Sequence, residues 1–97
     1  MDSTSEIMQV LRAARALLGL SQEELAQLSG VSRQIVIRIE KGEANILVDA
    51  LDKVRKSLEM QGVVFLPASR SHGPGIALGR SPSHPREENA TDVADER

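Results

Sequence analysis

The sequence predicts a small, mainly helical domain of about four helices, followed by a short β-hairpin and a disordered tail. Three observations support this fold class. Apolar residues recur at steps of three and four between residues 7 and 58. After Gly62 the pattern changes to two short β-rich runs, GVVFLP and GIALG, which predict a two-stranded hairpin of roughly residues 63–66 and 76–79. From about Arg80 the chain has little apolar content, two prolines and many charges. We therefore divide it into residues 1–62, 63–79 and 80–97.

The composition fits one small domain with an aliphatic core. The chain has 97 residues, of which 40% are hydrophobic, with one phenylalanine and no tryptophan or tyrosine. It has no cysteine, which excludes disulfides and thiolate metal sites and is compatible with a reducing cytosol. The first residues, MDSTSE, lack the basic and apolar regions of a signal peptide, and no stretch approaches membrane-spanning length. We expect a cytoplasmic protein without a membrane partner.

The net charge of −2 gives no overall basic signal for nucleic acid, but the charge is unevenly distributed. Residues 81–97 hold two basic and five acidic side chains. That segment alone contributes −3, so residues 1–80 sum to +1. The acidic character therefore belongs to the tail.

Two longer helices are predicted at the two ends of the helical region. The first should run from about Thr4 to Leu18 and end at Gly19, with one inward stripe. That stripe consists of Ile7, Val10, Leu11, Ala14, Leu17 and Leu18. The last helix should end near Gly62. Its inward residues are Leu47, Leu51, Val54 and Leu58.

Between them, SQEELAQLSGVSRQIVIRIEKG predicts two short helices joined by a tight turn. Ser21 is a good N-cap, and Glu24 three residues later completes a capping box. Gly30 suits the left-handed conformation that ends a helix. Ser32 then caps a second helix, which ends at Gly42.

Apolar residues beside the two caps predict the angle between these helices. Leu20 and Leu25 form one hydrophobic staple, and Val31 and Val36 repeat the arrangement around the second cap. Val36 and Ile39 should therefore point into the core. Two helices held in this way make a helix-turn-helix, whose second helix enters the DNA major groove in known examples.

The segment from Gly19 to Gly42 resembles the DNA-binding motif of the lambda-type phage repressor and Cro family, the XRE-type regulators. The resemblance covers about residues 7 to 61. The matching elements are Arg15, Gly19, Ser21-Gln22, Glu24-Leu25-Ala26, Gly30-Val31-Ser32 and Ile39-Glu40-Lys41-Gly42. The ending GVVFLP…GPGIAL is similar to the strand pair of very short regulators of this type. Val64 and Ala77 replace the acidic residue and the arginine usual there.

The resemblance implies a lambda-repressor-like fold and a set of DNA contacts. Arg33, Gln34 and Arg38 would face bases, since Arg suits guanine and Gln suits adenine as bidentate partners. Ile37 replaces a small polar residue and would meet a thymine methyl or simply be tolerated. The contacts expected at the DNA backbone come from Gln22, Ser32, Lys41 and the Gly42 amide.

The same resemblance implies two supporting contacts. Gln22 would steady Gln34, and Arg15 would form a partly buried ion pair with Glu40. The loop EANI after the second short helix lacks the basic residues that many relatives present to phosphate. A shallower salt dependence of DNA binding is expected for that reason.

The leading functional prediction is a transcriptional regulator that binds a palindromic operator in double-stranded DNA as a homodimer. Repression is the mode of regulation that we expect first. The hairpin is the expected part of the dimer interface, with the last helix as its rival. The alternative is an antitoxin or anti-activator that binds a partner protein, a toxin or an activator, with or without DNA autoregulation.

No enzyme, cofactor or metal site is predicted. Asp49 and Asp52 lie three residues apart without a nucleophile or helper residue. His72 and His84 lack neighbouring ligands at metal spacing. The cations Lys53, Arg55 and Lys56 are interpreted as a solvated helix face.

Overall fold

A computed structural model describes residues 3–80 of the chain. Within that range the elements are α1 (Ser3–Leu18), α2 (Gln22–Ser29), α3 (Arg33–Glu40), α4 (Val48–Met60), β1 (Val63–Leu66) and β2 (Gly75–Leu78). The predicted mainly helical fold with a C-terminal hairpin is confirmed. Helix α1 begins at Ser3, one residue earlier than expected. Of the predicted disordered tail, residues 81–97 lie outside the described residues.

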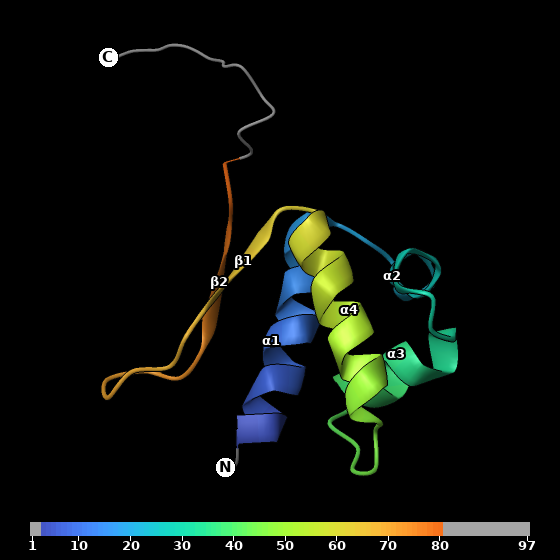
Figure 1. The fold of residues 1–97 in the computed structure, drawn as a ribbon, viewed down its shortest axis with the longest axis horizontal. Helices are drawn as coiled ribbons and strands as arrows, with labels where there is room; N and C mark the ends of the chain where they lie inside the picture. The colour runs from blue at the N-terminus through green and yellow to red at the C-terminus, as the bar shows by residue number, and fades with distance from the viewer. Residues whose placement is uncertain (1–2, 81–97) are drawn as a thin grey trace.

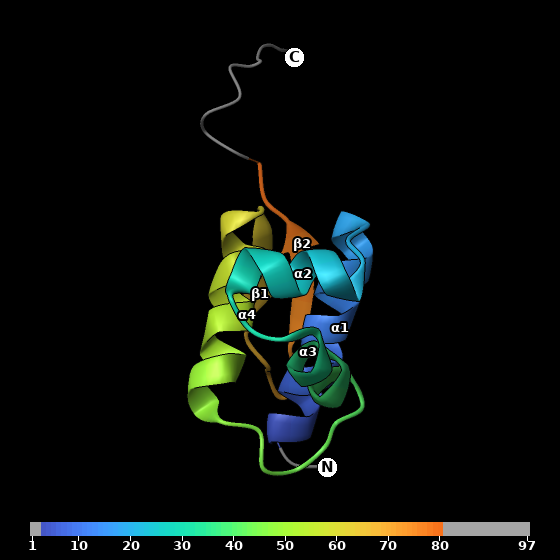
Figure 2. The same cartoon turned by 90° about the vertical axis from the view of Figure 1, so that its right-hand side faces the viewer.

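The elements are arranged in three layers. Helices α1 and α4 lie side by side in the middle, with α2 and α3 against one face and the hairpin against the other (Figures 1 and 2). Strand β2 contacts α1, and β1 contacts α4. The two short helices and the hairpin are therefore on opposite faces of the α1–α4 pair.

The core is aliphatic, as the composition predicts. Val36 and Ile39 of α3 and Val54 and Leu58 of α4 are all at most 1% exposed. Methionine, leucine, alanine and valine side chains from the other elements complete the cluster. These are Met8, Leu11, Ala14, Leu25, Ala26 and Val63.

The inward face of α1 differs from the predicted stripe. Met8 is buried, whereas Ile7 and Leu17, which were expected to face inward, are each 44% exposed. The helix is turned so that Met8, Leu11 and Ala14, at steps of three, point at the centre. Ile7 belongs to the side of α1 that faces the hairpin.

The predicted inward position of Leu47 is also wrong. Leu47 is the N-cap residue of α4 and is 75% exposed, and Val48 beside it is 79% exposed. The apolar spacing extends one turn beyond the part of α4 that packs on the other helices. The inward face begins at Leu51, which packs against the core.

The hairpin pairs its strands antiparallel, with Val64 opposite Ala77 and Phe65 opposite Ile76. The second strand covers residues 75–78 rather than the predicted 76–79. Successive side chains of a strand point to opposite faces. Val63 and Phe65 pack toward the helices, whereas Val64 is 43% exposed on the outer face. Leu66 is also 43% exposed but borders the hollow between the hairpin and α1.

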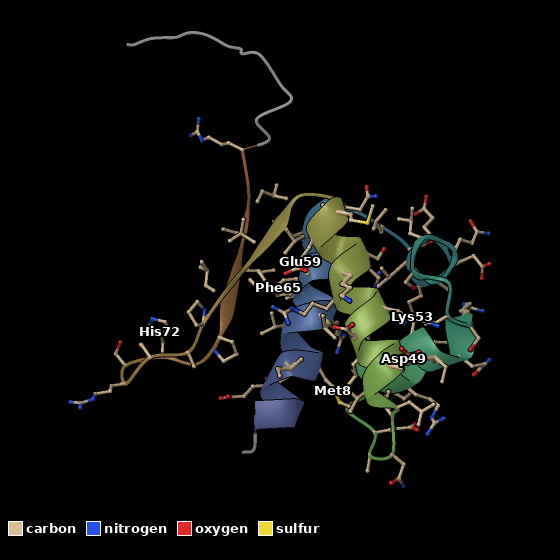
Figure 3. All side chains as sticks on the ribbon, in the orientation of Figure 1. Met8, Asp49, Lys53, Glu59, Phe65 and His72 are labelled. Carbon is tan, nitrogen blue, oxygen red and sulfur yellow. The ribbon has the colours of Figure 1, made fainter. Side chains whose placement is uncertain are left out.

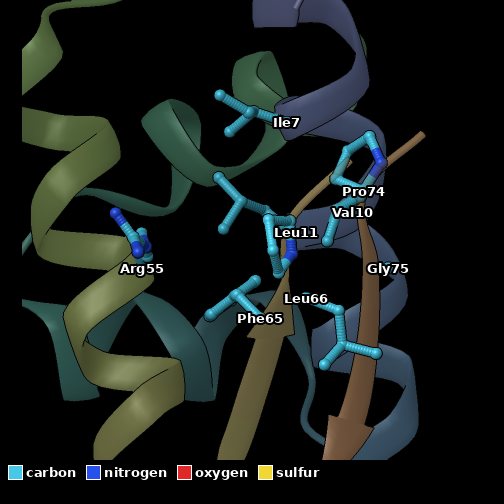
Figure 4. A pocket seen from close by; sticks show the side chains of 9 residues that line it. Ile7, Val10, Leu11, Arg55, Phe65, Leu66, Pro74 and Gly75 are labelled. Atoms are coloured by element: carbon cyan, nitrogen blue, oxygen red, sulfur yellow. The ribbon is translucent and has the colours of Figure 1, made fainter. Parts of the chain in front are cut away.

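A small apolar hollow lies under the hairpin, between it and α1 (Figure 4). Ile7, Val10 and Phe65 line its apolar walls. Arg55 of α4 borders the hollow, with its guanidinium carbon 5.7 Å from the centre of the Phe65 ring. This stacking and the buried Val63 attach the hairpin to the helical layer.

The rotation of α1 can be tested by comparing two neighbouring residues. Met8→Ala should lower the free energy of unfolding by about 2–5 kcal/mol, because it leaves a cavity in the core. Ile7→Ala should cost clearly less, since that side chain is already 44% exposed. Urea unfolding monitored by circular dichroism measures the free energy of unfolding of both variants. An equal or larger loss at Ile7 would contradict the observed orientation of α1.

Candidate nucleic-acid interface

Local hydrogen bonds that the sequence predicts define both ends of α2. The Ser21 hydroxyl accepts from the Glu24 amide at 3.0 Å, and a Glu24 carboxylate oxygen accepts from the Ser21 amide at 2.8 Å. This reciprocal pair is the predicted capping box. Helix α2 ends at Gly30, which has φ of 75° and donates its N–H to the Ala26 carbonyl. A residue with a side chain would be strained in that conformation.

The second helix of the motif, α3, begins at its own N-cap residue and is held in place by the apolar face that packs into the core. The Ser32 hydroxyl accepts from the Ile35 amide at 3.1 Å. Val36 and Ile39, three residues apart on one face of α3, are almost fully buried. The opposite face of the helix is therefore at the surface. Leu25 is buried as well, and Val31 packs against the core.

An ion pair ties the end of α3 to α1, as the family resemblance implies. Arg15 Nε lies 2.6 Å from Glu40 Oε2, and Arg15 Nη2 lies 2.9 Å from Glu40 Oε1. The side chains are 20% and 6% exposed, respectively. The hydrogen bonds that Arg15 donates to the Glu40 carboxylate raise the pKa of Arg15 above its ordinary value. Arg15 Nη1 also donates to the Leu20 carbonyl at 2.7 Å, so one side chain joins α1, α3 and the start of the motif.

Gln22 has a different partner from the one expected. Its Nε2 donates to Glu40 Oε1 at 3.0 Å, rather than to Gln34. Gln22 therefore completes the ion-pair network and links the first residue of α2 to the end of α3. It also borders a shallow hollow that Arg33 lines, which places the starts of α2 and α3 at one surface.

The predicted DNA-contacting residues of α3 form one accessible side of the motif. Arg33, Gln34 and Lys41 are exposed, whereas Ile37 and Arg38 are half-buried. Ser32 is exposed at the cap, and Gly42 follows the helix with φ of 73°. Helical spacing places Arg33, Gln34, Ile37 and Arg38 on the side of α3 away from the buried Val36 and Ile39, and Gln22 borders the same hollow as Arg33. Their contacts with DNA remain a prediction.

One contact in this surface was missed at the level of sequence. Arg38 Nε donates to Glu43 Oε1 at 2.9 Å, and the two side chains are 40% and 43% exposed. A spacing of five residues is not a helical pair spacing, so periodicity gives no sign of it. The acidic residue directly after the helix-ending Gly42 is the signal that could have indicated it.

The three cations of α4 form surface pairs one turn apart, in agreement with a solvated face for Lys53 and Lys56, whereas Arg55 also stacks on Phe65 of the hairpin. Lys53 pairs with Asp49 at 3.3 Å, and Lys56 pairs with Asp52 at 2.9 Å. Figure 3 shows Asp49 and Lys53 on α4, where both border a hollow that Ser32 also lines. The hydrogen bond that Lys56 donates to the Asp52 carboxylate raises the pKa of Lys56. These aspartates therefore serve as surface ion-pair partners.

Comparison with known proteins agrees with the geometry. Residues 11–61 match the model of a family described as helix-turn-helix. The chain belongs to this family, the XRE-type helix-turn-helix proteins. It is 40% identical over 48 residues to an HTH-type transcriptional regulator of Haemophilus influenzae. The match covers 50% of this chain and 49% of the relative, so the chain spans about half the length of the curated protein it matches.

Two further findings concern only residues 3–80. No cluster of three or more histidine, cysteine, aspartate or glutamate residues there has a metal-holding arrangement. None of the helices in that range combines the length and apolar character required to cross a membrane.

The contribution of the ion pair can be measured directly. Arg15→Met should destabilise the protein by about 3 kcal/mol, because it leaves the nearly buried Glu40 carboxylate unpaired. The double variant Arg15→Met, Glu40→Met should recover much of that loss, since both charges are removed. Lys53→Met, which breaks an exposed pair, should change stability by less than about 1 kcal/mol. Chemical unfolding checks all three, and a double variant no more stable than Arg15→Met would contradict the pairing.

Proposed function

We propose that the protein is a sequence-specific DNA-binding transcription regulator, acting as a repressor at a palindromic operator. One observation carries this proposal: the start of α3 is exposed at Arg33 and Gln34, while Val36 and Ile39 of the same helix are locked in the core. A rigid helix with polar groups at its exposed start is the arrangement that reads base edges in a major groove. Family membership and the name of the Haemophilus influenzae relative support the same function.

The proposed roles follow from the chemistry of each side chain. Arg33 and Arg38 would donate to guanine O6 and N7, and Gln34 would pair with adenine N6 and N7. Lys41 and the amide of Gly42 would lie against phosphate, which fixes orientation rather than sequence. Gln22 would contact phosphate through groups not used by Glu40.

Base reading by Arg33 can be tested with a duplex selected by the wild-type protein from a random pool. Arg33→Ala should weaken binding to that duplex about 5- to 150-fold, the equivalent of roughly 1–3 kcal/mol. Affinity for an unrelated duplex should fall much less. Fluorescence anisotropy at two salt concentrations measures both.

The matched control is Lys56→Ala, which removes one positive charge from α4, where Lys56 is paired with Asp52. It should leave both affinities nearly unchanged. Equal losses from Arg33→Ala on selected and unrelated DNA would show a phosphate contact in place of base reading.

We further propose that the protein is a homodimer joined through the outer face of the hairpin. All eight residues of the two strands are apolar or glycine, and the paired Val64 and Ala77 are exposed on that face. Because the hairpin lies on the opposite side of α1 and α4 from α3, this interface leaves the proposed DNA surface uncovered (Figure 1). The exposed start of α4, Leu47 and Val48, is the rival interface.

Point substitutions separate the two interfaces without removing the hairpin from the core. Val64→Lys should convert a dimer into a monomer in size-exclusion chromatography with light scattering, because it places a charge in the apolar contact. Leu47→Lys should leave the dimer intact. The opposite pair of results would assign the contact to α4. A monomeric wild-type protein would refute the homodimer and favour a partner protein on this face.

A further inference from the structure

The acidic residue that follows α3 is held against the helix by its backbone as well as by its side chain. The Gly42 amide donates to the Ile39 carbonyl at 2.9 Å, and the Glu43 amide donates to the Arg38 carbonyl at 3.1 Å. With Gly42 in the left-handed conformation, these two bonds form the Schellman ending of a helix. They turn the chain back so that Glu43 lies beside Arg38.

The side-chain contact uses only part of the Arg38 guanidinium. Glu43 Oε1 accepts from Nε at 2.9 Å. Within residues 3–80, no hydrogen bond to protein engages the terminal nitrogens Nη1 and Nη2 of Arg38. An arginine needs two nitrogens for a bidentate contact with guanine, and those two remain available.

We infer that Glu43 is a specificity-determining residue that positions Arg38 for base reading and opposes binding to DNA of any other sequence. This inference rests on the proposed DNA-binding function. Arginine has a flexible stem, so an arginine already held in one orientation loses less conformational freedom when it binds. The Glu43 carboxylate also lies near the phosphates that Lys41 and Gly42 would approach, and its charge repels them. Both effects raise the ratio of specific to non-specific affinity.

Glu43→Gln tests the inference because it removes the charge and keeps the shape and the backbone bonds. The ratio of affinities for the selected and an unrelated duplex should fall about tenfold, within the range of one lost bidentate contact. Affinity for the unrelated duplex should rise or stay constant. Thermal unfolding followed by circular dichroism confirms that the variant is folded.

Glu59→Gln is the matched control. Glu59 is 42% exposed and pairs with Arg55 on α4, so the substitution removes the same charge from a similar environment away from α3. It should leave the affinity ratio unchanged. If both substitutions lower the ratio equally, the effect belongs to net charge and the inference is wrong.

A second comparison shows whether Glu43 acts through Arg38. Duplexes with single base-pair changes identify the position at which Arg38→Ala loses discrimination. Glu43→Gln should lose discrimination at the same base-pair position. When Arg38→Ala is already present, adding Glu43→Gln should change the ratio of affinities for selected and unrelated DNA by less than about twofold. Loss at a different position, or an undiminished effect without Arg38, overturns the positioning role. A wild-type protein with no sequence preference would instead refute the proposed function itself.

Discussion

The position of α3 depends on the ion pair between Arg15 and Glu40. The burial of Val36 and Ile39 holds one face of the helix in the core, but apolar contacts are not directional. The two charged hydrogen bonds to Glu40, at 2.6 and 2.9 Å, specify where the C-terminal end of α3 must lie relative to α1. Gln22 and the Leu20 carbonyl join the same network, so the start of α2 is placed by it as well.

This network explains how so short a motif can be rigid without an extensive core. Helices α2 and α3 are eight residues each, too short to be stable alone. Local caps at Ser21 and Ser32 begin them, the ion pair joins the end of α3 to the longer α1, and Gln22 connects the start of α2 to the same network. The exposed start of α3, at Arg33 and Gln34, lies outside this network.

The surface of the motif also contains an acidic side chain where simple electrostatics would favour a basic one. Glu43 weakens the positive charge beside α3 and engages Arg38 at 2.9 Å. For a protein that must choose one site among many, lower affinity for all other DNA is an advantage, because specificity depends on the ratio of the two affinities. The hairpin, on the far side of α1 and α4, presents an apolar face that is independent of this surface.

The sequence by itself determined the features that arise from neighbouring residues. Capping at Ser21 and Ser32, the left-handed turn at Gly30 and the inward face of α3 all follow from local bonding and from helical period. The tertiary structure decided which way α1 is rotated, so that Met8 rather than Ile7 is buried, because packing against α3 and α4 selects among several apolar faces. It also decided the exposure of Leu47, the partner of Gln22 and the contact between Glu43 and Arg38. Each of these depends on where the chain turns in space, which no spacing along the sequence specifies.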